Sequence, residues 1–238
     1  MLIKYSGHNK FIFIANPKCA SSSIEESVVG KIADIRIMRT PLGKHMSIED
    51  IYKRFNWIFE HQEFSLDKFF KWGIIRDPIK RVVSWYNYRS RPTLKNRNKY
   101  TGDLSFNDFW NINKTTKLLQ PQYNNFFDIN DKSIKVDYLC RQECLLEDFL
   151  KIRDILGVNL SRFPKSNIST TRTIEVNDIE ESLKKEIKEY HAIDYELIEN
   201  LKSLNLEGLH KFQHFKQEIV ITNPVKTILR DVLSKIHL

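Results

Sequence analysis

The chain has 238 residues, of which 41% are apolar, and it contains only 7 glycines and 7 prolines. These values suit one globular domain with a real core, and they exclude a disordered or fibrous chain. The net charge of +8 favours an anionic partner such as a nucleotide, an acidic saccharide, a nucleic acid or a membrane surface, although a solvated basic face would give the same count.

The N-terminal segment and the cysteines bear on compartment and cofactors. Residues 1–10 are too polar for a signal peptide, and no apolar run reaches the ~18 residues that span a bilayer. Cys19, Cys140 and Cys144 are too few for a disulfide framework and lack the C-x-x-C spacing of zinc sites. We therefore expect a cytoplasmic protein without a transmembrane segment and without a metal.

Strand and helix signals alternate along the chain. Strands are predicted where a run is continuously apolar and β-branched, and helices where apolar residues recur every three or four positions. Ser47 followed by Asp50 resembles a capping box, and Pro78 suits the first turn of a helix. In chain order, the predicted elements are a strand at 10–15, a helix at 21–31, a strand at 32–38, a helix from 47, a strand at 70–75, a helix from 78, an exposed basic loop at 88–100, a short helix at 105–112, a strand at 135–143, a helix at 145–156 ended by Gly157, one or two helices at 177–201 and a C-terminal helix at 224–238.

This alternation predicts the fold class. Continuously apolar strands that alternate with helices are typical of a parallel sheet covered on both faces. We therefore expect an α/β fold with a central parallel sheet flanked by helices. Ligands bind such sheets at the carboxyl ends of the strands, so the loops after Ala15 and after Ile75 are the main candidates for a site.

The loop after the first predicted strand reads Pro-Lys-Cys-Ala-Ser-Ser-Ser at 17–23. A strand, a tight loop and a helix N-terminus form an anion site, because the first N–H groups of a helix lack intrahelical partners. Lys18 adds a mobile charge, and the serines add hydroxyl donors. The order of residues matches neither G-x-x-x-x-G-K-[ST] nor G-x-G-x-x-G. The alternative is a polar turn with a serine as helix N-cap.

The loop after the strand at 70–75 carries a second basic motif. Arg76 is expected at the end of that strand, and Ser84 lies eight residues further on, within the next helix. An arginine and a hydroxyl placed in this way can hold a second phosphate. Alternatively, Asp77 is only a helix cap, Arg76 forms an ion pair and Ser84 is incidental.

Together the two segments resemble the nucleotide motifs of sulfotransferases that use 3′-phosphoadenosine 5′-phosphosulfate. Residues 17–23 resemble the 5′-phosphosulfate loop, and residues 76–86 fill every position of the 3′-phosphate motif R-D-P-x-x-R-x-x-S-x-Y. The closest group is the carbohydrate sulfotransferases of family 2, which includes heparan sulfate 2-O-sulfotransferase and bacterial relatives. Segments 136–149 and 165–172 are also similar to that group.

The resemblance covers about residues 10–201. It implies a P-loop-like sulfotransferase fold in a single domain over 1–238, with a C-terminal helical extension at 202–238. In this family Lys18 should contact the bridging oxygen of the phosphosulfate. The resemblance implies that the donor is bound by Lys18, Cys19, Ala20, Ser21, Ser22, Ser23, Arg76, Ser84, Ser166 and Arg172.

The resemblance further implies roles within this set. Backbone amides of 20–23, with the hydroxyls of Ser22 and Ser23, should hold the 5′-phosphate. Arg76 and Ser84 should hold the 3′-phosphate, and the loop at 166–172 should close over the nucleotide.

The same family uses a His or Glu between the two motifs as general base. The chain offers His45, Glu60, His61 and Glu63 there. We favour His45, which comes just before a capped helix in a segment similar to the His-x-x-Ser of the family. A histidine needs no large pKa shift to act as a base at neutral pH.

The predicted function is transfer of a sulfuryl group to a hydroxyl of a glycan or similar acceptor by in-line displacement, with adenosine 3′,5′-bisphosphate as product. The acceptor can be acidic, and neither nucleic acid nor metal is implied. The basic residues of 89–99 can line a groove for an acidic saccharide or form a solvated loop. Trp85, Trp110 and Tyr123 can stack on sugar rings or belong to the core. Gln122 lies where acceptor contacts occur in the family.

Two other classes of function remain open at this point. One is a nucleotide-dependent kinase, although a Walker motif and a clear magnesium-binding Asp after a strand are missing from the sequence. The other is a non-catalytic module that binds nucleotides or acidic glycans, which the basic charge would also suit.

Overall fold

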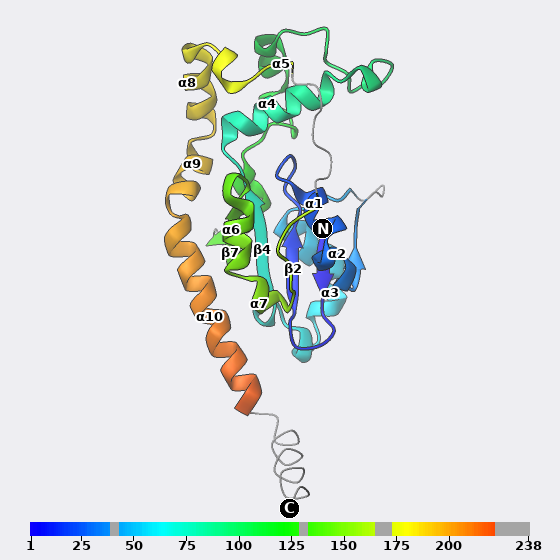
Figure 1. Ribbon diagram of the computed structural model, residues 1–238, viewed down its shortest axis with the longest axis vertical. Helices are drawn as coiled ribbons and strands as arrows, with labels where there is room; N and C mark the ends of the chain where they lie inside the picture. The colour runs from blue at the N-terminus through cyan, green and yellow to red at the C-terminus, as the bar shows by residue number, and fades with distance from the viewer. Residues whose placement is uncertain (39–42, 129–132, 165–172, 222–238) are drawn as a thin grey trace, which may run out of the picture.

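The computed structural model describes residues 1–38, 43–128, 133–164 and 173–221 (Figure 1). Five strands form one sheet in the order β3-β1-β2-β4-β7, and β5 and β6 form a separate two-stranded ladder. The strands are β1 Leu2–Lys4, β2 Phe11–Ile14, β3 Ile35–Arg36, β4 Phe70–Ile75, β5 Phe127–Asp128, β6 Ser133–Ile134 and β7 Tyr138–Arg141.

The large sheet is mixed but mostly parallel. Strands β2, β4 and β7 run parallel, whereas β1 pairs antiparallel with both β2 and β3. The predicted α/β class is therefore confirmed, with an antiparallel addition at one side. The sequence does not predict β1, because residues 1–10 are polar overall, although Leu2 and Ile3 are fully buried. The strand expected at 32–38 is reduced to Ile35–Arg36.

Helices account for most of the remaining chain. The single helix predicted at 145–156 is wrong, because the segment breaks after Leu150 into α6 and α7. The segment at 177–201, predicted as one or two helices, forms two helices that meet at His191. The helix expected at 224–238 lies outside the described residues. The α-helices are α1 Ser21–Glu26, α2 Val28–Ile32, α3 Ile48–Phe59, α4 Pro78–Arg89, α5 Phe106–Asn113, α6 Leu145–Leu150, α7 Arg153–Leu156, α8 Glu181–Tyr190, α9 Ala192–Glu199 and α10 Leu201–Ile221. The 3-10 helices are η1 Gln62–Phe64, η2 Leu66–Lys68, η3 Pro92–Leu94, η4 Gln122–Asn125, η5 Gln142–Cys144 and η6 Val176–Asp178.

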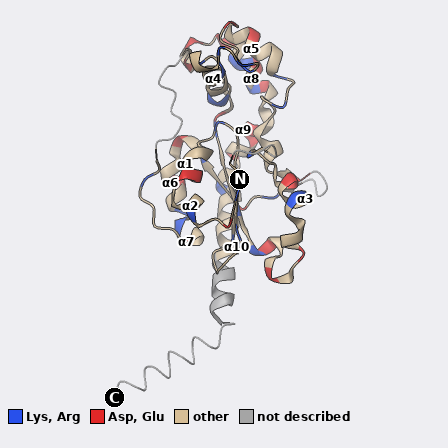
Figure 2. Cartoon of the chain, turned by 90° about the vertical axis from the view of Figure 1, so that its right-hand side faces the viewer, with Lys and Arg blue, Asp and Glu red and all other residues tan. Residues whose placement is uncertain are grey.

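Helices cover both faces of the sheet (Figure 2). On one face, Phe11 and Phe13 pack with residues of α1, α2, α6 and α7. On the other face, Ile12 and Ile14 pack with residues of α3 and α9. All four side chains are fully buried, and each contributes about 1.5–3 kcal/mol through burial. Burial on both faces explains why β2 reads as a continuous apolar run rather than an alternating one.

A third apolar cluster stands over the carboxyl ends of the parallel strands, where α4, α5 and α8 meet (Figure 1). Tyr86 of α4 makes edge-on ring contacts with Phe106 and Phe109 of α5. Ile187 of α8 is fully buried in the same cluster. The cluster fixes α4 at the end of the sheet where the predicted ligand loops lie.

The helix predicted at 21–31 is wrong as a single element, because Ser27 divides it into α1 and α2. The Ser27 hydroxyl donates to the Ile24 carbonyl at 2.7 Å and accepts from the Val29 N–H at 3.2 Å. A side chain that bonds to nearby backbone in this way competes with helical hydrogen bonds. The two helices then lie so close that a Cβ at Gly30 would be 2.0 Å from the Glu25 carbonyl oxygen.

Helix α10 runs along the edge strand β7 (Figure 1). The Asn205 carboxamide accepts from the Leu139 N–H at 2.9 Å and donates to the Leu139 carbonyl at 3.0 Å. A neighbouring strand would make these same bonds, so Asn205 satisfies backbone groups at an otherwise open edge. Gly208 allows this approach, since a Cβ there would lie 1.7 Å from the Asp137 carbonyl oxygen. Within the described residues, no helix is both long enough and apolar enough to cross a membrane.

Replacing Gly208 by Ala should lower the free energy of unfolding by about 1–3 kcal/mol, because α10 must move away from β7. Chemical denaturation measures this loss. Glu207→Ala changes the exposed neighbour on the same helix and should stay within about 0.5 kcal/mol of the parent protein. Equal stability of the two variants would contradict the close packing of α10.

Candidate functional site

A cavity of about 890 Å³ opens at the carboxyl ends of β2 and β4, and we call it the larger cavity. Its volume is typical of sites for small molecules. Ser166 and Arg172, with the predicted covering loop, lie outside the described residues. Of the residues predicted from the sequence, the cavity is lined by Lys18, Ala20, Ser21, Ser22, Ser23, His45, Arg76 and Ser84. The fold thus brings both sequence motifs and the favoured base to one cavity.

The loop after β2 has a strained backbone. Lys18 and Ala20 have φ angles of 62° and 56°, in the left-handed region that costs most L-residues about 1–2 kcal/mol. The Arg76 guanidinium donates to the Lys18 carbonyl at 3.0 Å, which ties this loop to the end of β4. The Ser23 N–H donates to the Ala20 carbonyl at 2.9 Å. The Ser23 N–H is therefore engaged within the turn. Of the backbone N–H groups of 20–23 that are predicted to hold the 5′-phosphate, those of residues 20–22 are left for this role.

Cys19 points away from the larger cavity. Its side chain is fully buried, and its thiol donates to the side-chain oxygen of Gln122 at 3.3 Å. Burial raises the pKa of the thiol to about 12, so it stays protonated at neutral pH. The expectation that Cys19 binds the donor therefore applies only to its backbone, not to its side chain.

The buried carboxamide of Gln122 joins the two loops. Its oxygen accepts from the side chain of Asn16 at 2.9 Å and from the backbone N–H of Arg76 at 3.1 Å. Its nitrogen donates to the Arg76 carbonyl at 2.7 Å. Gln122 is 0% exposed and therefore cannot contact an acceptor, the role that its position in the sequence suggested. It instead holds the ends of β2 and β4 at a fixed separation.

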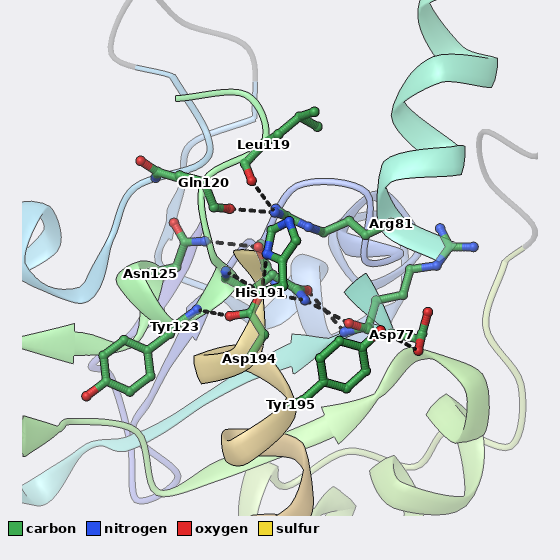
Figure 3. Close-up of polar contacts among 12 residues, drawn as sticks. Asp77, Arg81, Leu119, Gln120, Tyr123, Asn125, His191, Asp194 and Tyr195 are labelled. Atoms are coloured by element: carbon green, nitrogen blue, oxygen red, sulfur yellow. Dashed lines mark hydrogen bonds and ion pairs between the residues drawn. The ribbon is translucent and has the colours of Figure 1, made fainter. Parts of the chain in front are cut away.

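Asp194 of α9 anchors this network from the opposite side (Figure 3). Its carboxylate accepts from the backbone N–H groups of Gln122 at 3.0 Å and of Tyr123 at 2.8 Å. The His191 ring donates from Nδ1 to the same carboxylate at 3.1 Å. Burial alone would raise the pKa of Asp194, but these hydrogen bonds outweigh it, and the pKa is lowered. The carboxylate is therefore charged where it fixes η4.

Lys18 lies against two aromatic rings of α4. Its ammonium nitrogen is 4.4 Å from the centre of the Tyr88 ring and 5.6 Å from that of Trp85. Burial, with Arg91 and Arg76 nearby, lowers the pKa of Lys18 to about 8. The ring faces attract the cation and partly offset the loss of hydration.

Lys44 is a site residue that the sequence analysis did not identify. Its ammonium nitrogen lies 3.1 Å from the Ser22 hydroxyl and 2.9 Å from the buried Glu25 carboxylate. It also lines the larger cavity. The sequence did contain a signal for Lys44. It directly precedes His45, and a residue next to the expected general base is carried to the same site by the fold.

His45 has a defined tautomer. Its Nδ1 is 2.5 Å from the carbonyl oxygen of Ala15, and because a carbonyl can only accept, Nδ1 carries the proton. The lone pair of the neutral ring is therefore on Nε2. Burial is the main cause that lowers the pKa of His45, to about 4, although the bond to Ala15 opposes it. His45 is neutral at physiological pH and able to accept a proton.

The alternative bases lie elsewhere. Glu60, His61 and Glu63 are exposed, and none of them lines the larger cavity. Helix α3 starts near His45 and runs for 12 residues, which separates its two ends by about 18 Å. This separation explains why residues close to His45 in the sequence are remote from it in space.

A second cavity, of about 480 Å³, adjoins the larger one, and we call it the smaller cavity. His45 and Trp85 line both cavities. Trp110 belongs to the core and donates to Glu186, while Tyr123 lines neither cavity. Of the predicted aromatic residues, Trp85 alone is placed to contact a ligand.

The basic residues of 89–99 have different positions. Arg89 lines the smaller cavity, whereas Arg91 and Lys99 lie 4.9 and 5.8 Å from the centre of the Tyr88 ring. Lys95 and Arg97 are exposed and line neither cavity. The segment is thus partly a cavity wall and partly a solvated loop.

A family model described as "Sulfotransferase family" matches residues 2–216. The chain belongs to the sulfotransferase family. Comparison with curated proteins and with solved structures finds no match. The part of this sulfotransferase that matches the family includes β1 and much of α10 as well as both loops. The described residues of this sulfotransferase contain no group of three or more His, Cys, Asp or Glu that could hold a metal ion.

Replacing Tyr88 by Leu should lower the pKa of Lys18 further below about 8, because the cation loses a ring face worth about 1 kcal/mol. This loss corresponds to about 0.7 of a pKa unit, which an NMR titration of the Lys18 side chain would resolve. Tyr88→Phe keeps the ring face and should leave the pKa near that of the parent protein. Identical values in the Leu and Phe variants would show that the ring does not stabilise Lys18.

Proposed function

We propose that this sulfotransferase moves a sulfuryl group from 3′-phosphoadenosine 5′-phosphosulfate to a hydroxyl of a glycan or similar acceptor. The observation that carries the proposal is the meeting of two cavities at His45, whose Nε2 is free to accept a proton. A donor in the larger cavity and an acceptor in the smaller cavity would react at this junction.

The charges of the larger cavity suit such a donor. Lys18, Lys44, Arg76 and Lys80 line it, and Glu175 is the one carboxylate among its described lining residues. The donor carries two phosphate groups and a sulfate, so an excess of cations favours its binding. Carbohydrate as the acceptor class rests on the resemblance of segments 17–23, 76–86 and 136–149 to the carbohydrate sulfotransferases.

The residues can perform an in-line displacement. As the acceptor oxygen forms a bond to sulfur, the bond between sulfur and the bridging oxygen breaks, and that oxygen leaves with adenosine 3′,5′-bisphosphate. Lys18 stabilises the charge that develops on the leaving group, and His45 Nε2 takes the proton of the acceptor hydroxyl. The cation–π contacts and the tie from Arg76 hold Lys18 in place before the reaction.

A binding assay without metal tests the proposed donor against the alternative of a kinase. Adenosine 3′,5′-bisphosphate should bind more tightly than ATP, because Arg76 and Ser84 line the same cavity as the Lys18 loop and can hold a 3′-phosphate that ATP lacks. Isothermal titration calorimetry measures both affinities. A preference for ATP would overturn the proposal, and turnover of a hydroxyl acceptor separates an enzyme from a binding module.

The rate should depend on pH through His45 and Lys18. His45 must be neutral, so kcat/KM should fall as pH drops through about 4, and Lys18 must be charged, so it should fall as pH rises through about 8. These limits refer to the free enzyme. His45→Ala should reduce kcat ~10²–10⁴-fold and remove the acidic limb.

His61→Ala is the matched control, since it removes an exposed histidine that lines neither cavity. It should retain the activity and pH profile of the parent enzyme. If His45→Ala keeps near-normal turnover while Lys18→Ala abolishes it, His45 is not the base.

A further inference from the structure

Lys18 carries an amine in a cavity that is rich in cations. It is half-buried in the wall of the larger cavity, which Lys44, Arg76 and Lys80 also line. We propose that Lys18 is a site of covalent modification, and that acyl phosphates, the mixed anhydrides of carboxylic and phosphoric acids, acylate its amine. The inference goes beyond the proposed function, and only its consequence for sulfuryl transfer rests on that function.

The surroundings of Lys18 favour a reactive amine. No ion pair among the described residues includes Lys18, whose ammonium nitrogen lies 4.4 Å from the centre of the Tyr88 ring. A carboxylate would hold the proton on the nitrogen more strongly than an aromatic face does. Burial, with Arg91 and Arg76 nearby, lowers the pKa of Lys18 to about 8, so about a tenth of it is neutral at pH 7. A lysine in water is neutral in fewer than about one in a thousand molecules at that pH.

The groups around Lys18 can hold the phosphate of such a reagent. The Lys44 ammonium lies 3.1 Å from the Ser22 hydroxyl, and because an ammonium can only donate, the Ser22 oxygen accepts this bond. The hydroxyl proton of Ser22 is then available to an anion beside the charge of Lys44. The Arg76 guanidinium donates to the Lys18 carbonyl at 3.0 Å, which keeps a second cation at the same loop. Both cations are close enough to contribute to the lowered pKa of Lys18.

The reaction needs no reagent other than the acyl phosphate. The neutral Lys18 nitrogen forms a bond to the acyl carbon, and the bond between that carbon and the phosphate oxygen breaks. Phosphate leaves with the electron pair and takes the proton that the new amide nitrogen releases. A desolvated lysine beside other cations is a recognised form of activated nucleophile. The resulting amide is uncharged, so under the proposed function an acylated Lys18 cannot stabilise the leaving group, and acylation stops sulfuryl transfer.

Two acetyl donors test this inference, acetyl phosphate and p-nitrophenyl acetate, of which only the first carries a phosphate. Each is incubated with the full chain at neutral pH, and peptide mass spectrometry follows the acetylation of Lys18 and of the exposed Lys95. Acetyl phosphate should acetylate Lys18 at least about 10-fold faster than Lys95, because a larger share of the Lys18 amine is neutral. Saturating inorganic phosphate should slow this reaction at Lys18 and leave that at Lys95 unchanged.

A variant separates recognition of the phosphate from reactivity of the amine. Lys44→Gln keeps a hydrogen-bond donor beside Ser22 but removes the charge. It should slow acetylation of Lys18 by acetyl phosphate at least about 5-fold, as expected for a lost charge-assisted hydrogen bond, and leave the rate with p-nitrophenyl acetate within about 2-fold. That second rate also shows that the variant is folded. Lys95→Gln removes an exposed charge outside both cavities and should change neither rate at Lys18.

Other outcomes have distinct meanings. Equal rates at Lys18 and Lys95 with acetyl phosphate, no protection by inorganic phosphate, or an unchanged rate with acetyl phosphate in Lys44→Gln would overturn the inference. Adenosine 3′,5′-bisphosphate should also protect Lys18, because it would occupy the same cavity. Failure of the bisphosphate to bind the unmodified protein would overturn the proposed function instead, and the acetylation rates and their response to inorganic phosphate would still decide the inference.

Discussion

The hydrogen bonds of one buried side chain, Gln122, hold together the two loops on which the rest of the site depends. Its carboxamide bonds to Asn16 after β2 and to both backbone groups of Arg76 after β4. Neighbouring parallel strands end side by side, but their loops would otherwise be free to diverge. Asp194 fixes the Gln122 backbone from α9, so a helix distant in sequence sets the spacing of the cavity walls.

An excess of basic over acidic residues is the second general property of the site. Burial works against the charges of Lys18, Arg81 and Arg89, and the lowered pKa of each group records that cost. The same environment keeps His45 neutral, with its Nδ1 proton directed to Ala15. The site thus contains a base that needs no carboxylate partner, because burial, together with the nearby charges of Lys44 and the N-terminus, lowers the pKa of His45 and keeps it unprotonated.

The sequence predicts those parts of the site that depend on residues adjacent in the chain. Residues 17–23 and 76–86 are recognisable because strand, loop and helix follow one another, and Asp77 caps α4 as its position before Pro78 indicates. Gln122 is not predictable in the same way, since its partners lie more than 40 positions away and its role exists only in the folded chain. The sequence does not predict the break at Ser27. A serine within a helical apolar pattern can stay in the helix, or its side chain can bond to nearby backbone and end the helix, and the choice depends on the surrounding fold.

The indole of Trp85 is a wall common to both cavities. A ligand on one side that displaces or steadies the ring changes the shape presented on the other side. Coupling of this kind is reciprocal: under the proposed assignment of donor and acceptor to the two cavities, whatever factor the donor applies to acceptor affinity, the acceptor applies to donor affinity. Under the same assignment, a substitution at Trp85 should alter both dissociation constants together, so selection for a new acceptor at this position would also act on the affinity for the donor.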